Sequence, residues 1–223
     1  SIRIKNKTIG QGHSTFIIAE AGVNHNGELA LAKKLVKAAK KAGADAVKFQ
    51  TFKSENLVTK NAEMAEYQRK NTGTRESQFS MLEKLELKYN DFKTLKDYCN
   101  ENDIIFLSTP HTFDAIDFLD EIVPAFKIGS GDLTNIPALS YVAKKRKPML
   151  LGTGMATLDE VKNAVKSIKS EGNDRIVALH CITNYPCSYN EQNLNAITTM
   201  KEKLDCLIGY SDHTLEYLAS VIA

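Results

Sequence analysis

The stretch MLLGTGMATLDEVKNAVKSIKSEGNDRIVALHC, residues 149–181, contains two short apolar runs separated by an amphipathic segment. Met149–Gly152 and Ile176–Cys181 are mostly apolar, as strands buried on both faces of a sheet are. Between them, Thr157 followed by Glu160 is the capping-box pattern of a helix N-terminus. That helix is predicted to bury four side chains spaced along one face: Val161, Ala164, Val165 and Ile168. The stretch therefore predicts a strand–helix–strand unit of a parallel sheet.

The same alternation continues in both directions along the chain. Five further apolar runs are predicted strands: Phe16–Ala21, Ala46–Gln50, Ile104–Ser108, Phe126–Gly129 and Cys206–Tyr210. Residues 28–42 are predicted to form a helix that ends at Gly43, and its expected buried side chains are Leu31, Leu35, Ala38, Ala39 and Ala42. Asp91 is expected to cap the helix that buries Phe92, Leu95 and Cys99. Residues 215–223 begin a seventh helix.

These units predict a (β/α)8 (TIM) barrel over residues 1–223, seen as seven strands and lacking the eighth. An open doubly wound sheet is the weaker alternative, because no G-x-G-x-x-G follows the first strand. The start of the chain, Ile2 to Phe16, is expected to form a β-hairpin with its turn at Asn6-Lys7.

Composition excludes several functional classes. The 29 basic and 27 acidic residues leave a formal net charge of +2, which argues against general nucleic-acid binding. No apolar run is long enough to span a membrane, and the first residues lack a signal-peptide core. The four cysteines form no C-x-x-C pair, so we expect reduced thiols in a cytoplasmic protein and no zinc site built from them.

Polar residues recur where the predicted strands end, which is where a barrel keeps its chemistry. Lys48 and Lys127 each interrupt an apolar strand, and Gln50 shares a face with Lys48. Charges rarely enter a core unpaired, so the alternatives are an internal salt bridge, for example to Glu20, or an anion-binding site. Two such lysines near several hydroxyl groups favour the anion site, and a Schiff-base lysine is a rival role. Gly129-Ser130-Gly131 offers main-chain N–H groups for a phosphate, although turn formation explains it equally well.

Two histidines end consecutive predicted strands, His180 and His213. Neutral imidazoles suit a divalent transition ion, and a carboxylate such as Glu20 would bind it or orient its water. The alternative is a pair of hydrogen-bonded histidines at the rim. His25 and His111 are expected to line the site, with turn capping as their alternative role. The connection from Thr51 to Glu76 has no clear helical pattern and is interpreted as a lid or a solvated insertion.

Taken together, these segments resemble the sialic-acid synthase family. The resemblance runs through nearly the whole chain in order, at IIAEAGVNHNG (17–27), VKFQ (47–50), LSTP (107–110), FKIGSG (126–131), GTGM (152–155), LHC (179–181) with Tyr185-Pro186, and GYSDHT (209–214). The connection after residue 51 is similar to the bacterial branch that includes legionaminic-acid synthases.

The resemblance implies an enzyme, a metal-dependent transferase that condenses phosphoenolpyruvate with an N-acylated mannose-type sugar to give a nine-carbon 2-keto acid and phosphate. The product would be N-acetylneuraminate or a legionaminic acid. A divalent ion, Mn²⁺ with Mg²⁺ or Co²⁺ as alternatives, would be held by His180 and His213. The implied catalytic residues are Glu20, Lys48, Lys127 and His213. The implied substrate-binding residues are Asn24, Gln50, Thr109, Ser130, Thr153, Thr183, Asn184, Tyr185 and Ser211.

Two departures from the family pattern matter. Gly152 stands where the family often has serine, which removes one expected phosphate-binding hydroxyl. After His180 the order of residues leaves open whether Thr183 or Asn184 faces the ligand. The family also carries a small C-terminal antifreeze-like domain and forms homodimers. We therefore expect this chain to lack that domain, and the full-length protein to be a homodimer.

Two rival functions come from other classes. One is an aldolase-type lyase that uses Lys48 or Lys127 as a Schiff base without a metal. The other is an inactive barrel fragment that serves only as a binding or structural module.

Overall fold

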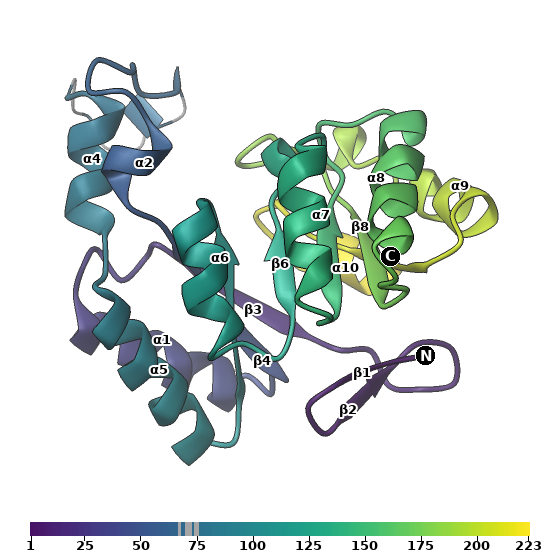
Figure 1. Ribbon diagram of the computed structural model, residues 1–223, viewed down its shortest axis with the longest axis horizontal. Helices are drawn as coiled ribbons and strands as arrows, with labels where there is room; N and C mark the ends of the chain where they lie inside the picture. The colour runs from purple at the N-terminus through teal and green to yellow at the C-terminus, as the bar shows by residue number, and fades with distance from the viewer. Residues whose placement is uncertain (67, 70–72, 74–75) are drawn as a thin grey trace. The chain divides into compact units, whose positions relative to one another are not determined.

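The computed structural model describes residues 1–66, 68, 69, 73 and 76–223, which form two compact units. One unit is Phe16–Val123, and the other combines Ser1–Thr15 with Pro124–Ala223. Each contains a parallel sheet whose strands are connected through helices (Figure 1). The predicted alternation of strands and helices is therefore confirmed within each unit.

The sheet of the Phe16–Val123 unit has the order β3-β4-β5. Its strands are β3 (Ile18–Gly22), β4 (Ala46–Thr51) and β5 (Ile105–Pro110), and its helices include α1 (Leu29–Lys41), α2 (Ser54–Leu57), α4 (Gln78–Leu85), α5 (Tyr89–Glu101) and α6 (Phe113–Asp120). Nearly every residue of β4 and β5 is buried, as expected for strands covered on both faces. Helices α1 and α5 lie side by side against this sheet (Figure 1).

Two details of these helices differ from the prediction. The side chains of α1 that are buried are Ala32, Val36 and Ala39, whereas Ala38 is exposed, so the apolar face is rotated from the predicted stripe. The face is set by packing on β3, β4 and α5, where small side chains permit close approach. Asp91 is not the N-cap of α5, because Lys88 occupies that position. Asp91 is the third residue of the helix, and its carboxylate accepts a hydrogen bond from the main-chain N–H of Lys88.

The sheet of the second unit has the order β6-β7-β8-β9. Its parallel strands are β6 (Phe126–Ile128), β7 (Met149–Gly152), β8 (Ile176–His180) and β9 (Leu207–Tyr210), with helices α7 (Ile136–Lys144), α8 (Leu158–Ser170), α9 (Asn195–Lys203) and α10 (Leu218–Ile222). The capping box of Thr157 and Glu160 is present at α8, and the four predicted side chains of that helix are buried. The sequence pattern quoted first is thus confirmed in detail.

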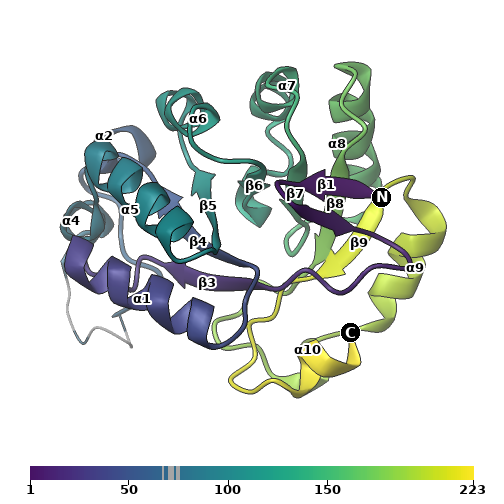
Figure 2. The same cartoon turned by 90° about the horizontal axis from the view of Figure 1, so that it is seen from below.

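The N-terminal hairpin consists of β1 (Ile2–Ile4) and β2 (Lys7–Ile9). Ile4 pairs with Lys7, so the turn is Lys5-Asn6, one residue earlier than predicted, with Lys5 at φ 50°. Gly10 follows at φ 134°, and a Cβ there would come within 3.5 Å of Leu207 at the start of β9. Figure 2 shows the hairpin in this unit.

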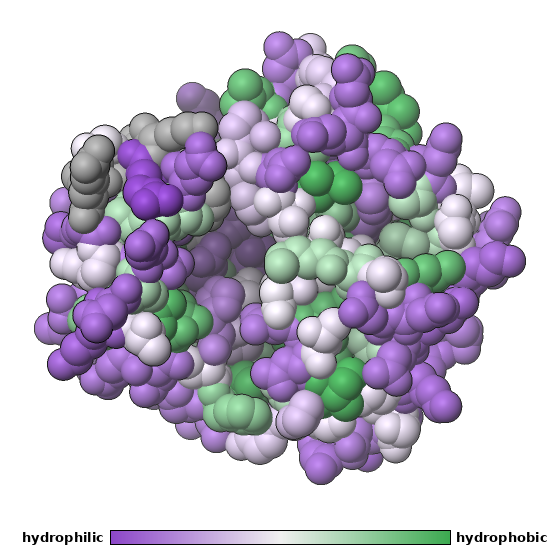
Figure 3. Space-filling model, turned by 90° about the horizontal axis from the view of Figure 1, so that it is seen from above, coloured by the Kyte–Doolittle hydropathy of each residue, from purple (hydrophilic) through white to green (hydrophobic). Residues whose placement is uncertain are grey.

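Side chains sort by polarity as in other globular domains. The largest fully buried side chains are apolar and include Phe49, Phe92, Phe106 and Phe126. Hydrophilic residues cover most of the face shown in Figure 3. Within the described part of the chain, none of the helices has the length and apolar character needed to cross a membrane.

Candidate active site

Four predicted site residues meet at the carboxyl ends of β3, β4 and β5. Parallel pairing places Glu20 opposite Lys48, and Gln50 opposite Thr109. The Lys48 ammonium forms an ion pair with the Glu20 carboxylate and lies 3.4 Å from Thr109 Oγ1. Lys48 is buried, whereas the Glu20 side chain is half exposed. The strand register thus assembles one cation, one carboxylate and two neutral polar groups.

The loop after β3 turns tightly beside this group. Gly22 has φ 53°, and a Cβ at that position would lie 3.3 Å from Glu20 Oε1 and 3.8 Å from Gln50 Nε2. Asn24 is exposed in this loop. His25 is buried instead, and its Nδ1 accepts a hydrogen bond from the Gly27 N–H, so turn capping describes it better than lining the site. Burial lowers the pKa of His25 and keeps its ring neutral.

A second group forms at the ends of β6 and β7. Lys127 Nζ donates to the Ile128 carbonyl, and Gly154 N–H donates to Ser130 Oγ at 3.0 Å. A Cβ on Gly152 would lie 2.8 Å from Ser130 Oγ and 3.2 Å from Lys127 Nζ. Gly152 therefore lets the predicted cation and hydroxyl approach the same stretch of main chain. The structure places Lys127 and Ser130 near each other, and the anion site that they are expected to form stays a prediction.

Four other predicted substrate-binding residues have local partners. The Thr153 hydroxyl donates to the Leu179 carbonyl at 3.0 Å, which uses its only proton. Thr183 lies 3.5 Å from the Gly154 carbonyl, while Asn184 Nδ2 donates to the exposed Glu191. The ring of Tyr185 lies 4.4 Å from that of His213, centroid to centroid.

Of the two predicted metal ligands, His180 is the last residue of β8 and His213 follows the adjacent strand β9. His180 pairs with Tyr210 in the register of β8 and β9, and the Ser211 N–H donates to the His180 carbonyl. His180 is buried, and its Nε2 lies 2.7 Å from the Gln192 carbonyl. His213 is half-buried, and its Nδ1 lies 2.5 Å from the Ile182 carbonyl. Because a carbonyl can only accept, each of these ring nitrogens carries a proton.

This arrangement fits metal binding in one respect. A neutral ring that donates through one nitrogen keeps its lone pair on the other, and metal-ligating histidines commonly donate to a main-chain carbonyl in this way. In the neutral form of each ring, the lone pair would lie on Nε2 in His213 and on Nδ1 in His180. In the ranges that the structure describes, no three or more His, Cys, Asp and Glu side chains are grouped so that they could hold a metal ion. Two imidazoles would thus need further ligands from substrate, water or other residues.

Two polar residues near the histidines were not predicted as site residues, although Asp212 lies within the GYSDHT segment (209–214). Gln192 is buried, and its side-chain Oε1 accepts a hydrogen bond from the Tyr210 hydroxyl while its carbonyl contacts His180. Asp212 accepts from the Ser220 hydroxyl and the Thr214 N–H. Burial opposes ionisation of Asp212, but these bonds and one from Tyr210 outweigh it and lower its pKa. No periodic pattern marks Gln192, because it lies in a loop that only the fold brings to β8.

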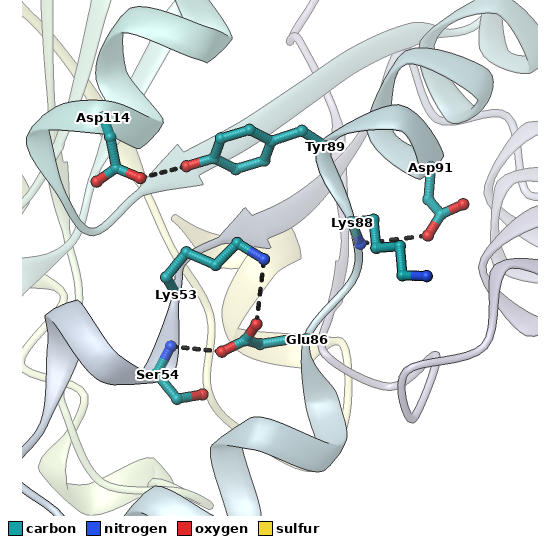
Figure 4. Close-up of polar contacts among 7 residues, drawn as sticks. All are labelled: Lys53, Ser54, Glu86, Lys88, Tyr89, Asp91 and Asp114. Atoms are coloured by element: carbon teal, nitrogen blue, oxygen red, sulfur yellow. Dashed lines mark hydrogen bonds and ion pairs between the residues drawn. The ribbon is translucent and has the colours of Figure 1, made fainter.

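The connection after β4 is fixed at both ends (Figure 4). The Glu86 carboxylate, just after α4, accepts from the Ser54 N–H and pairs with Lys53 at 3.3 Å. Tyr89 in turn donates to Asp114 at the start of α6. Between these ends, residues 67, 70–72, 74 and 75 lie outside the described residues, so the lid interpretation stays a prediction.

Comparison with known proteins identifies the family. The family model described as "NeuB family" matches residues 35–223. This chain belongs to the NeuB family. The predicted resemblance to sialic-acid synthases is thereby confirmed.

Individual relatives agree with this assignment. The N,N'-diacetyllegionaminic acid synthase of Legionella pneumophila is 47% identical over 222 residues, covering 97% of this chain and 62% of that protein. The N-acetylneuraminic acid synthetase of Leptospira borgpetersenii, solved with citrate, matches with a TM-score of 0.87 at 32% identity and covers 99% of this chain and 73% of that one. This chain therefore spans less than two thirds of the length of the Legionella relative.

The structural neighbours also establish the fold class of this NeuB chain. A truncated 3-deoxy-D-arabino-heptulosonate 7-phosphate synthase from Thermotoga maritima has a TM-score of 0.69 at 16% identity, over 96% of this chain and 69% of that one, and so bears on fold alone. It and the Leptospira protein are (β/α)8 barrels, and the predicted α/β barrel class is confirmed.

Proposed function

We propose that this NeuB chain is the catalytic barrel of a nonulosonic acid synthase. It would condense phosphoenolpyruvate with an N-acylated mannose-type sugar and release phosphate and a nine-carbon 2-keto acid. Family membership supports the enzyme class, and the 47% identity to a diacetyllegionaminic acid synthase favours a legionaminic or N-acetylneuraminic acid product. The observation that carries the proposal is that each compact unit holds a lysine beside a hydroxyl group at the ends of its parallel strands. These are Lys48 with Thr109 in one unit and Lys127 near Ser130 in the other.

These groups match the chemistry of phosphoenolpyruvate, which carries a phosphate and a carboxylate. Lysine ammonium groups supply charge, and hydroxyl and main-chain N–H groups supply directed hydrogen bonds. Lys48 is already engaged with Glu20 and Thr109, which suits an electrostatic role better than Schiff-base formation. The half-exposed Glu20 carboxylate can hold the water that adds to the former enol carbon, as a general base would.

The remaining residues are proposed to bind the sugar or complete the site. Tyr185, packed near His213, would contact the sugar, with Asn24, Gln50 and Ser211 as further polar contacts. Thr183 is favoured over Asn184 as the residue facing the ligand, because Asn184 is exposed and paired with Glu191. Thr153 would act as an acceptor, since its proton is bonded to Leu179.

A divalent ion, Mn²⁺ in preference to Mg²⁺ or Co²⁺, is proposed as the cofactor. His213 is the better supported ligand, because its Nε2 carries the lone pair and the residue is only half-buried. His180 would have to use Nδ1. When bound, the ion supplies Lewis-acid polarisation of the sugar aldehyde. The full-length protein is proposed to act as a homodimer.

A phosphate-release assay tests this function. The full-length protein would be incubated with phosphoenolpyruvate, Mn²⁺ and a panel of mono- and di-N-acylated mannose-type hexosamines. We expect release that requires both a sugar and the metal, and loss of activity with EDTA that Mn²⁺ restores. No release with any sugar, together with a borohydride-trapped adduct of a keto acid, would replace the proposal with an aldolase.

A further inference from the structure

Cys181 lies directly beside the hydroxyl group that is proposed to bind the substrate anion. It follows β8, is buried, and its Sγ is 3.2 Å from Ser130 Oγ. It is a free thiol, like Cys99, Cys187 and Cys206. The approach depends on Gly154, where a Cβ would lie 2.9 Å from the Cys181 carbonyl and 3.0 Å from its sulfur. The loops after β7 and β8 therefore pack tightly enough to set the position of this thiol.

The Ser130 hydroxyl has one proton and two lone pairs. The Gly154 N–H donates to one lone pair at 3.0 Å. The contact with Cys181 then allows two arrangements, because either the hydroxyl donates to sulfur or the thiol donates to oxygen. In the first arrangement the Ser130 proton is directed at Sγ, and no proton remains for a ligand.

The oxygens of an anion only accept hydrogen bonds. An anion can therefore be bound by the Ser130 hydroxyl only in the second arrangement, in which the Ser130 proton is not directed at sulfur. We infer that the Cys181 thiol donates to Ser130 Oγ and so directs the Ser130 proton to the phosphate or carboxylate of the substrate. Cys181 is thus a positioning residue that acts through Ser130. This inference rests on the proposed function, in which Ser130 binds phosphoenolpyruvate.

The neighbouring glycine strengthens the inference. A Cβ added to Gly152 would lie 2.8 Å from Ser130 Oγ and 3.2 Å from Lys127 Nζ. The cation and the hydroxyl therefore lie near one point of the main chain, so a single anion can contact both. A serine at position 152 would bring its Cβ within 2.8 Å of Ser130 Oγ, so the Ser130 hydroxyl could keep its present position only where residue 152 is glycine. Because Gly152 supplies no hydroxyl, binding of the anion depends more on the direction of the Ser130 O–H group.

Four variants of the full-length protein test the role: Cys181→Ala, Cys181→Ser, Ser130→Ala and the double variant Cys181→Ala/Ser130→Ala. Phosphate release would give KM for phosphoenolpyruvate and, separately, KM for the sugar. Losing one hydrogen-bond donor corresponds to a change of about three- to tenfold. We expect Cys181→Ala to raise KM for phosphoenolpyruvate by about that factor. We expect Cys181→Ser, which keeps a donor, to restore the wild-type value, and neither to change KM for the sugar.

The double variant measures the coupling directly. If the thiol acts through Ser130, adding Cys181→Ala to Ser130→Ala should have no further effect on KM for phosphoenolpyruvate. Cys206→Ala is the matched control. Cys206 is also a free thiol, but it comes just before β9 begins, whereas Cys181 comes just after β8 ends, so its replacement should leave KM unchanged. Mn²⁺ affinity is measured in parallel and should stay constant, which separates the effect from a disturbance of the adjacent His180.

Several outcomes would overturn the inference. They are a wild-type KM in Cys181→Ala, equal losses in the alanine and serine variants, or equal effects of Cys181→Ala with and without Ser130. If the wild-type protein releases no phosphate, the proposed function fails instead. Calorimetric titration of the same proteins with phosphoenolpyruvate then decides the role of Cys181: weakened binding in Cys181→Ala and retained binding in Cys181→Ser support it, and equal binding refutes it.

Discussion

Lys48 and Lys127 both interrupt apolar strands, yet they have different surroundings. Lys48 is buried and paired with Glu20, so the internal salt bridge that sequence offered as an alternative is present. Lys127 is half-buried and donates to the Ile128 carbonyl beside Ser130. An anion would join the Lys48–Glu20 pair rather than meet an isolated cation. The two lysines therefore predict different consequences when they are replaced.

Replacing each lysine by methionine keeps most of the side-chain volume and removes the charge. In Lys127→Met we expect KM for phosphoenolpyruvate to rise by at least tenfold, or turnover to be lost, because a hydrogen bond to a charged group contributes about 1.5–3 kcal/mol. We expect little effect of this change on stability. In Lys48→Met we expect the same kinetic defect together with lower stability, because Glu20 loses its partner. Steady-state kinetics and urea unfolding measure both. Unaltered kinetics in both variants would remove the lysines from the substrate site.

The two histidines also predict unequal effects. His213→Ala should weaken Mn²⁺ binding by tenfold or more, since it removes Nε2, the ring nitrogen that is not engaged with the Ile182 carbonyl and is proposed to bind the ion. His180→Ala should reduce stability as well, because the ring is buried and bonded to the Gln192 carbonyl. Calorimetric titration with Mn²⁺ and thermal unfolding separate the two effects. Unchanged metal affinity in His213→Ala would reject the site.

At the scale of secondary-structure elements, the Glu86 carboxylate fixes the connection between β4 and α5 through hydrogen bonds. Glu86 links the start of α2 to the end of α4 through Ser54 and Lys53 (Figure 4). Burial opposes its ionisation, but hydrogen bonds from Ser54 and Lys53 outweigh this and lower the pKa of Glu86. The carboxylate stabilises the fold in its charged form. This makes the connection a structured part of the domain near its two ends.

The lowered pKa sets the sign of a pH dependence. Glu86 contributes its full stabilisation at pH values above the unfolded pKa of about 4.3, and the contribution is lost as pH falls through the lower folded value. Glu86→Gln should therefore reduce the free energy of unfolding by about 1–2 kcal/mol at pH 7 and have less effect in acid. Urea unfolding across this range measures it. Glu121→Gln is the control, because Glu121 forms an exposed pair with Lys93 at 3.6 Å and its replacement should change stability little. An equal effect of both variants at pH 7 would contradict the role of Glu86.

For the whole molecule, each compact unit contains its own group of predicted site residues. Glu20, Lys48, Gln50 and Thr109 belong to Phe16–Val123, while Lys127, Ser130, His180 and His213 belong to the other unit. The formal net charge of +2 supplies little general attraction for an anion. Binding must come from these local groups, and it can be measured as a stabilisation of the native protein.

Phosphoenolpyruvate should raise the melting temperature of the full-length protein. A ligand at 100 times its Kd stabilises the native state by about 2.7 kcal/mol. We expect a saturable shift with phosphoenolpyruvate, a smaller one with pyruvate, which lacks the phosphate, and a smaller one in Lys127→Met at the same phosphoenolpyruvate concentration. Differential scanning calorimetry measures all three. A shift in Lys127→Met as large as in the wild type would show that the ligand binds elsewhere.

Sequence by itself determined the local structure and the order of the elements. The strand–helix alternation and the capping box at Thr157 depend on periodicity and on contacts within a few residues, so they are visible in a linear pattern. Sequence also located Lys48, Lys127 and Ser130, because a charge or a glycine-rich turn at a strand end is locally conspicuous. The predicted buried face of α1 and the predicted N-cap of α5 were wrong. The buried face depends on which elements pack against the helix, and the N-cap depends on the exact residue at which the helix begins. Sequence offered the Lys48–Glu20 pair as one of two alternatives, and the tertiary structure shows that the pair forms. Only the tertiary structure brought Gln192 to His180 and placed Cys181 against Ser130, because these contacts join residues 12 and 51 positions apart whose distance depends on strand register and loop packing.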